Sequence, residues 1–244
     1  MNDRVAVITG GARGIGRAVA LSLAQQGWSV AICYRTSHQP AQETIGALTE
    51  MGLRAMAEQC DVSDPEAAAR FVAKVEKEWG RIDALINGAG PYHRVNLMDE
   101  TVEGWLDMFD NNLHHVFYMS KLVAPGMQQR RWGRIVNFSM ANADQLVAQP
   151  QITAHYIAKA GVLVLTRTLA KALAPAGITV NAISPGFLNS GSAPESELEK
   201  MTKNIPAGYV GAVSDAVAVV NFLLSDEARY VNGANIHLSG AWGI

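Results

Sequence analysis

Three glycines near the start of the chain, Gly10, Gly14 and Gly16, stand between an apolar run and an amphipathic run. Glycine permits a tight turn, lets backbone approach a phosphate without a Cβ in the way, and lets a helix pack closely on a strand. A helix that begins there offers unpaired N–H groups and its positive dipole end to an anion. We therefore expect the strand, turn and helix over residues 5–27 to bind a dinucleotide pyrophosphate, with Ile15 as a further contact.

The residues after the second expected strand indicate which dinucleotide binds. An acidic side chain there would accept the ribose 2′-hydroxyl of NAD, but the sequence has Arg35, Thr36 and Ser37. The Arg35 guanidinium can pair with a 2′-phosphate, and the two hydroxyls can donate to it. Arg13, in the glycine turn, can reach the same phosphate. The sequence therefore favours NADP(H) over NAD(H); the alternative is that both arginines are simply solvated.

Residues at the ends of the third and fourth expected strands complete the predicted cofactor site. Asp61, followed by Val62, can accept a hydrogen bond from the adenine amino group or can cap a turn. The fourth strand ends in a group of mostly small residues that leaves room for a cofactor across the sheet: Asn87, Gly88, Ala89 and Gly90.

Strand and helix patterns alternate along all 244 residues, which predicts one α/β domain (residues 1–244) with a Rossmann-type, doubly wound parallel sheet. The expected strands cover residues 5–9, 29–34, 53–60, 82–87, 134–139, 179–183 and 235–238. Long helices are expected over 101–131 and 153–173, and a short one over 215–224. The Pro-, Gly- and Ser-containing segment 187–209 is expected to form a mobile flap over the substrate.

Composition narrows the possible partners. The net charge of −2 provides no broad basic field for nucleic acid or an acidic membrane, which favours a small-molecule ligand. The absence of a signal peptide and of a long apolar run predicts a cytoplasmic protein without a membrane partner. Cys33 and Cys60 lie near strand ends and are interpreted as small buried residues. His114 and His115 lack a third ligand at metal spacing, so we expect no metal and a surface or interface position.

The chain as a whole resembles the short-chain dehydrogenase/reductase family. Its glycine turn is similar to the family's turn, and 87–90 resembles the Asn-Asn-Ala-Gly motif, with Gly88 at the second asparagine. Asn112 resembles the active-site asparagine, and Pro185, Gly186 and Leu188 resemble the Pro-Gly turn that contacts the cofactor. The resemblance implies strand order 3-2-1-4-5-6-7, a homodimer or homotetramer, and hydride transfer between a nicotinamide and a carbonyl or alcohol carbon. The sequence is most similar to NADPH-using oxoacyl-carrier-protein reductases and pteridine reductases.

The family's catalytic pattern, Tyr-x-x-x-Lys, is altered in this sequence. The resemblance implies that Lys159 holds the nicotinamide ribose and that the residue four before it donates a proton to the carbonyl oxygen. That residue is His155, and Tyr156 follows it. Residues three and four apart on a helix are both neighbours, so either ring can lie near Lys159, and both remain candidate donors. A histidine there would be a poor proton donor at neutral pH, because the lysine charge lowers the pKa of the imidazolium and leaves a neutral ring.

The family usually has a Ser-Ser pair after the fifth strand, and its second serine orients the substrate. The position of that second serine resembles Met140, which cannot donate a hydrogen bond. Ser139, Asn142 or Asp144 can replace the missing hydroxyl, although Ser139 can equally be a strand-end residue bonded to backbone. Asn112 can hold a water and the lysine, or mark a helix kink.

These residues predict an NADP(H)-dependent oxidoreductase that reduces a ketone or 3-oxoacyl-like substrate. The alternative is an NADP(H)-binding sensor or scaffold with weak or no catalysis, because the tyrosine and serine positions are altered.

Overall fold

The structure, a computed structural model, describes residues 4–189 and 195–244. Its main sheet is parallel and has the order β3-β2-β1-β4-β5-β6-β9. This confirms the expected topology, since β9 is the seventh strand of that sheet. The strands of the main sheet are β1 (Val5–Thr9), β2 (Ser29–Tyr34), β3 (Ala55–Gln59), β4 (Ala84–Asn87), β5 (Gly133–Phe138), β6 (Ile178–Pro185) and β9 (Asn235–Leu238).

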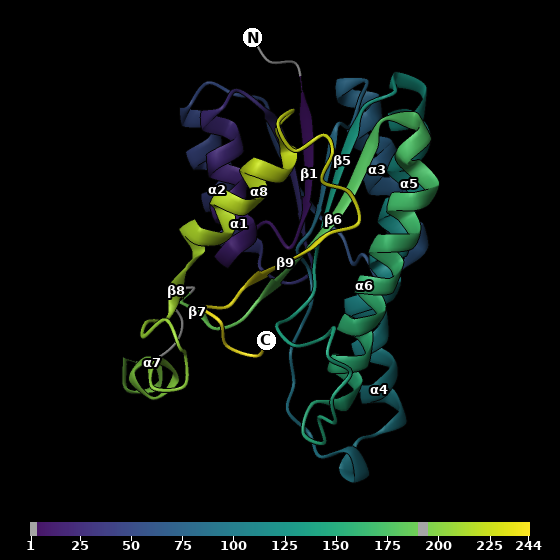
Figure 1. Cartoon of the computed structure of the whole chain (residues 1–244). Coiled ribbons are helices and arrows are strands. Elements are labelled where there is room, and N and C mark those ends of the chain that lie inside the picture. The colour runs from purple at the N-terminus through teal and green to yellow at the C-terminus, as the bar shows by residue number, and fades with distance from the viewer. Residues whose placement is uncertain (1–3, 190–194) are drawn as a thin grey trace.

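The central strands β1, β4 and β5 are buried along their whole length because both faces of the sheet are covered. Along β1, Val5 and Val7 face one hydrophobic core, whereas Ala6 and Ile8 face the other, and all four are fully buried. One core lies against the helices α1 (Gly14–Gln25), α2 (His38–Glu50) and α8 (Val213–Leu224). The other lies against α3 (Pro65–Trp79), α5 (His115–Arg130) and α6 (Thr153–Leu173). Figure 1 shows the sheet between these two helical layers.

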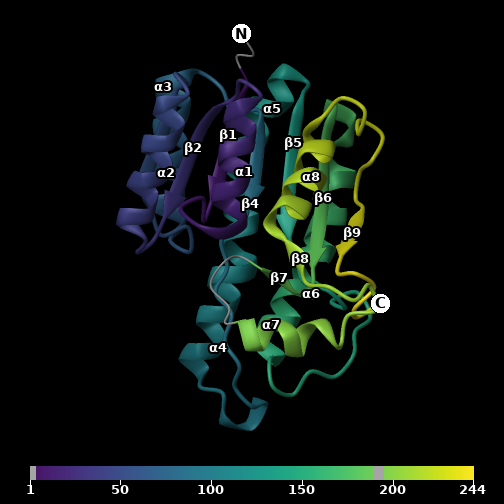
Figure 2. The ribbon, with the colours of Figure 1, turned by 90° about the vertical axis from the view of Figure 1, so that its left-hand side faces the viewer.

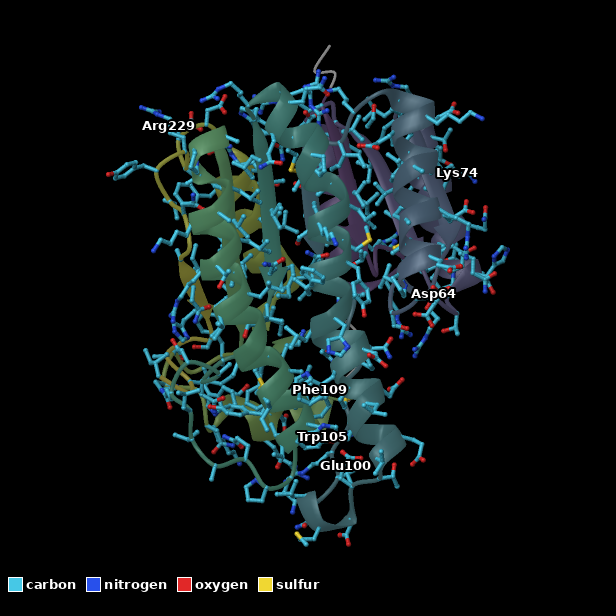
Figure 3. All side chains as sticks on the ribbon, turned by 90° about the vertical axis from the view of Figure 1, so that its right-hand side faces the viewer. Asp64, Lys74, Glu100, Trp105, Phe109 and Arg229 are labelled. Atoms are coloured by element: carbon cyan, nitrogen blue, oxygen red, sulfur yellow. The ribbon has the colours of Figure 1, made fainter. Side chains whose placement is uncertain are left out.

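Local signals fix where the helices begin and end, as α3 illustrates. The Asp64 side chain accepts a hydrogen bond from the backbone N–H of Glu66 at 2.9 Å, and Pro65 occupies the first helical position. The helix ends at Gly80 in the left-handed conformation. Figure 3 labels Asp64 near the beginning of this helix and Lys74 further along it. No helix in the described ranges is long and apolar enough to cross a bilayer.

Two helical segments extend beyond the carboxyl ends of the strands, where open α/β sheets bind ligands. They are α4 (Val102–Phe109) and α7 (Glu195–Thr202), which lie on opposite sides of that end in Figure 1 and below the sheet in Figure 2. On α4, Trp105 and Phe109 stack with their ring centroids 5.2 Å apart. Figure 3 labels both residues. The expected flap 187–209 contains α7 and the short strand β7 (Leu188–Asn189), which pairs with β8 (Gly211–Ala212). Residues 190–194 of it lie outside the described residues, and its mobility stays a prediction.

The helical stretch expected over 101–131 is present, but it is not α-helical throughout. A π-helical turn, η2 (Asp110–His114), separates α4 from α5. The Asn112 amide nitrogen donates to the Met108 carbonyl at 3.0 Å and to the Pro91 carbonyl at 3.1 Å, which ties the turn to the segment after β4. Such π turns often occur at functional sites. The turn therefore fixes Asn112 at the carboxyl end of the sheet.

His114 and His115 were both expected at the surface or at an interface, and this expectation is wrong for His115. His115, at the start of α5, is fully buried, because its helix face packs against the sheet. His114 is partly exposed, and its Nδ1 contacts Asp110 at 2.6 Å.

Candidate active site

A cavity of about 370 Å³ lies at the carboxyl ends of β1, β2 and β4, next to the start of α1. It brings together most of the predicted cofactor-binding residues, namely Gly10, Arg13, Ile15, Gly16, Arg35, Thr36, Ser37, Asp61, Val62, Gly88, Ala89 and Gly90. Sequence reasoning missed six other lining residues: Ala12, Cys33, Tyr34, Cys60, Pro91 and Asn111. Most of them are direct sequence neighbours of predicted residues, so extending each predicted segment by one residue would have found them.

The glycine turn has the backbone geometry that its composition predicted. Gly10 and Gly14 have φ values of +69° and +57°, in the left-handed region that favours glycine. A Cβ on Gly16 would lie 2.4 Å from the Gly10 carbonyl oxygen, so α1 approaches the turn more closely than any side chain permits. No described side chain caps the start of α1. Its first N–H groups can therefore serve an anion in the cavity.

At the far end of the cavity, Arg35 bridges two elements. Its Nη1 donates to the Asn111 side-chain oxygen at 3.0 Å and lies 4.0 Å from an Asp61 carboxylate oxygen. The other Asp61 oxygen accepts from the backbone N–H and the hydroxyl of Ser63, at 3.0 and 2.7 Å. Asp61 thus caps a turn, one of its two predicted roles, and its adenine contact stays a prediction. The half-exposed Arg35–Asp61 pair is a weak surface ion pair, which a phosphate can replace.

At the opposite end, Lys159 and Asn112 meet beside Gly90. A Cβ on Gly90 would lie 3.2 Å from Lys159 Nζ and 2.6 Å from Asn112 Oδ1. Lys159 Nζ donates to the Phe138 carbonyl at 2.9 Å, and burial lowers the pKa of this amine to about 8. Asn112 Oδ1 is buried without a hydrogen-bond partner among the described residues. The site therefore has a buried cation and a free acceptor at a point that only glycine leaves open.

The two rings before Lys159 differ in what they contact. The buried Tyr156 hydroxyl donates to the Asn142 carbonyl at 2.8 Å and accepts from the Val147 N–H at 3.1 Å, so it anchors the loop between β5 and α6. His155 instead packs edge-on against Tyr92, with ring centroids 5.2 Å apart. Burial first, and then the charges of Lys159 and His93, lower the pKa of His155 to about 3. His155 is therefore a neutral ring at neutral pH.

Two of the three candidate replacements for the missing serine hydroxyl make side-chain hydrogen bonds to other residues. Ser139 Oγ donates to the Lys159 carbonyl at 2.8 Å, which is the strand-end geometry considered as its alternative role. Asp144 accepts from His237 on β9 at 2.9 Å. Asn142 accepts the Tyr156 hydroxyl through its backbone carbonyl, whereas its side-chain oxygen is buried without a hydrogen-bond partner among the described residues. No hydroxyl of Ser139 or Tyr156 is left without a protein partner.

Several predicted cofactor contacts lie outside the cavity. Gly14 begins α1, and Asn87 donates to the Asn137 side chain at 2.8 Å. Beyond the end of β6, the Gly186 N–H donates to the Leu238 carbonyl at 3.0 Å. The other predicted cofactor contacts at this end are Pro185 and Leu188, which belong to β6 and β7, and neither lines the cavity. Their contact with a cofactor stays a prediction.

Comparisons with known proteins agree with this architecture. The model of the family described as enoyl-(acyl carrier protein) reductase matches residues 10–241. The 3-oxoacyl-(acyl-carrier-protein) reductase FabG of Staphylococcus aureus is 37% identical over 238 residues, 96% of each chain. That of Pseudomonas aeruginosa is 34% identical and covers 98% of this chain and 97% of its own.

Solved structures show the same similarity. Acetoin dehydrogenase YohF from Salmonella typhimurium has a TM-score of 0.89 and 29% identity, covering 98% of this chain and 95% of that one. An NAD⁺-bound xylitol dehydrogenase has a TM-score of 0.89 and 28% identity, covering 98% and 99%. The chain belongs to the matched family and, with it, to the short-chain dehydrogenases/reductases. It is an oxidoreductase of the kind that acts on C=O and CH–OH groups.

The contacts of the Tyr156 hydroxyl predict that it stabilises the fold and does not contact the cofactor. Tyr156→Phe removes one hydrogen bond to Asn142 and one from Val147 in a buried setting. We expect the free energy of unfolding to fall by about 1–3 kcal/mol, with dinucleotide affinity unchanged. Denaturant unfolding and fluorescence titration measure the two quantities. Tyr230→Phe, at an almost fully exposed ring, is the control. A large loss of dinucleotide affinity in Tyr156→Phe would place this hydroxyl at the cofactor instead.

The two buried histidines predict how stability depends on pH. Burial is the largest cause that lowers the pKa of both His115 and His155 to about 3. An unfolded histidine takes up its proton near pH 6.5, so between these values the unfolded state binds more protons. The free energy of unfolding therefore falls as pH decreases below about 6.5, by up to about 1.4 kcal/mol per pH unit for each histidine.

Denaturant unfolding between about pH 4 and pH 7 measures this slope. His115→Leu removes one of the two titrations, so its slope should be shallower than that of the unsubstituted protein by up to the same amount. Val116→Ala, at a neighbouring buried position, removes no titratable group and should lower the free energy of unfolding without changing the slope. Equal slopes for His115→Leu and the unsubstituted protein would show that His115 is protonated in the folded state.

Proposed function

We propose that this protein is an NADPH-dependent reductase that converts a ketone to an alcohol, with a 3-oxoacyl thioester as the first candidate substrate. The observation that carries the proposal is the meeting of Lys159 and Asn112 beside Gly90, at the end of a cavity suited to a dinucleotide. The named 3-oxoacyl-(acyl-carrier-protein) reductases among its relatives support the substrate class.

The residues present fit NADP(H). The uncapped start of α1 suits the pyrophosphate, and Arg35, Thr36 and Ser37 line the opposite end of the cavity. The Arg35 guanidinium is half-exposed and is held at the cavity by Asn111, so it can pair with a 2′-phosphate. One structural neighbour is bound to NAD⁺; the preference proposed here rests on Arg35.

In the proposed mechanism, bound NADPH supplies a hydride to the carbonyl carbon. Lys159 holds the ribose hydroxyls, and its charge stabilises the oxyanion that develops on the substrate. Asn112 Oδ1 accepts a hydrogen bond from a water molecule bound beside Lys159. His155 stands at the family's tyrosine position, and one N–H of its neutral ring donates to the carbonyl oxygen. Full proton transfer requires the imidazolium form, which is scarce at neutral pH because of the low pKa.

A second function, an NADP(H)-binding sensor or scaffold, is favoured by a different observation. The hydroxyls of Ser139 and Tyr156 are both engaged with backbone groups. The site then lacks the free phenol and serine of the family pattern, while the nucleotide cavity keeps its residues. Turnover distinguishes the two functions.

We also propose that the chain acts in the cytoplasm, as a homodimer or homotetramer with a small-molecule substrate and without a nucleic-acid or membrane partner. An apolar groove on α5 and α6 supports self-association. It is lined by Leu113, His114, Phe117, Tyr118, Gly161, Val164, Leu165 and Thr168. Phe117 and Val164 are 44% and 64% exposed, more than an apolar side chain favours in an isolated subunit.

Cofactor preference is tested at Arg35. Arg35→Ala removes the charge-assisted contact to a 2′-phosphate, so we expect NADPH affinity to fall about 10- to 100-fold and NADH affinity to change little. Fluorescence titration with both dinucleotides measures this. Arg70→Ala, on exposed α3, is the charge-matched control. Equal losses for NADH and NADPH would mean that Arg35 does not recognise the 2′-phosphate.

Catalysis is tested at His155. The purified protein is assayed for NADPH oxidation with 3-oxoacyl thioesters and small ketones, beside His155→Tyr and Lys159→Ala. His155→Tyr creates the family's Tyr-x-x-x-Lys pattern, so we expect kcat to rise about 100-fold or more, whereas Lys159→Ala should abolish turnover. Tyr156→Phe is the neighbouring-ring control and should keep its kcat. NADPH binding without turnover in both the unsubstituted protein and His155→Tyr would favour the sensor.

A further inference from the structure

Two residues with nucleophilic side chains that the proposed reaction does not use line the nucleotide cavity. Cys33 is the second-last residue of β2, and Cys60 directly follows β3. Both are free thiols, both are buried, and both line the cavity that we assign to the dinucleotide. We propose that Cys33 and Cys60 form a modifiable dithiol site, which a peroxide oxidises to a disulfide that excludes the dinucleotide. The loss of dinucleotide binding rests on the proposed function, whereas the formation of the disulfide does not depend on it.

The register of the sheet puts the two thiols on one face. Cys33 pairs with Glu58 on the parallel strand β3, and Cys60 is two residues beyond Glu58. Alternate residues of a strand point to the same face, so Cys33 and Cys60 both face the core beneath α3 and α5, and they belong to one hydrophobic cluster. The Cys60 N–H donates to the Tyr34 carbonyl at 2.9 Å, which continues the ladder to this point.

The thiols also influence one another directly. The Cys33 thiol donates a hydrogen bond to Cys60, and this is the largest cause that raises the pKa of Cys33 and lowers that of Cys60. Cys60 is therefore the more readily ionised of the two, and the thiolate is the attacking form in thiol chemistry. Cys33, with its proton held against Cys60, is placed to resolve the product.

The chemistry balances with a hydroperoxide as oxidant. The Cys60 thiolate attacks the peroxide oxygen, the O–O bond breaks, and the released hydroxide takes a proton to become water. Cys33 sulfur then attacks the Cys60 sulfenic acid, an S–S bond forms, and a second water leaves with the Cys33 proton. Two thiols are oxidised by two electrons, and one hydrogen peroxide is reduced to two waters. A dithiol reductant reverses the step.

Formation of the Cys33–Cys60 disulfide would disturb the glycine turn that we assign to the pyrophosphate. The Cys33 carbonyl accepts the N–H groups of Gly10 and Gly11, at 3.0 and 3.3 Å, so the backbone of Cys33 holds the glycine turn in place. A disulfide requires Cα atoms about 4.4–6.8 Å apart, and β3 is an edge strand that can shift toward β2. Asp61, next to Cys60, would move with it relative to Arg35. Dinucleotide binding and oxidation should therefore oppose each other reciprocally.

The test treats the reduced full-length protein with hydrogen peroxide, with and without saturating NADP⁺, and maps peptides under non-reducing conditions. We expect a Cys33–Cys60 cross-link and an intact mass lower by two hydrogens, formed more slowly with NADP⁺. NADPH affinity, measured by fluorescence titration, should fall about tenfold or more and return with dithiothreitol, which does not reverse methionine oxidation.

Cys33→Ser and Cys60→Ser are the matched variants. In each, peroxide should produce no cross-link, and NADPH affinity should stay at that variant's own untreated value. Sulfinic acid at Cys60 without a cross-link, or no reaction, would overturn the dithiol site. A cross-link that leaves NADPH affinity unchanged would overturn the exclusion. If the reduced protein binds no NADPH, the proposed function fails, and the peptide map still decides whether the dithiol exists.

Discussion

The approach of α1 to the first turn is the constraint on which the nucleotide end depends. A Cβ at Gly16 would lie 2.4 Å from the Gly10 carbonyl oxygen, so backbone meets backbone there. That contact brings the uncapped start of α1 to the edge where β1, β2 and β4 end. The turn is held in addition by two N–H groups bonded to the Cys33 carbonyl. The same few atoms thus position the anion-binding groups and join them to β2.

Much of this architecture could be predicted from the sequence, because buried parallel strands and helix caps leave local signals. The strands over 5–9 and 235–238 and the helix over 153–173 have the expected bounds. The π turn could not be predicted, since five residues such as Asp110–His114 carry too little periodicity to separate a π turn from an α turn. The burial of His115 was missed because polar residues normally indicate a solvent-facing surface.

In the candidate site, too, some features have local sequence signals and others depend on contacts between distant segments. Residues that leave room for a ligand through their small size, such as Gly10 and Gly90, are determined by local backbone geometry and could be predicted from the sequence. Whether His155 or Tyr156 faces Lys159 depends on the loop between β5 and α6, whose Asn142 and Val147 bind the Tyr156 hydroxyl. Contacts of that kind join segments whose relative placement no spacing rule gives. Sequence reasoning therefore left both rings open as donors.

Electrostatics distinguishes this site from one built around a phenol. Between about pH 3 and pH 8, Lys159 carries its charge while His155 is neutral, since burial and the lysine charge both oppose a second cation. A neutral imidazole can donate one hydrogen bond but loses its proton far less readily than a phenol beside a lysine. In the proposed reaction, the oxyanion would therefore be stabilised mainly by the Lys159 charge in a dry environment, where such a charge acts strongly. Hydride transfer would then depend less on a proton from the protein, and the alkoxide would take its final proton from solvent.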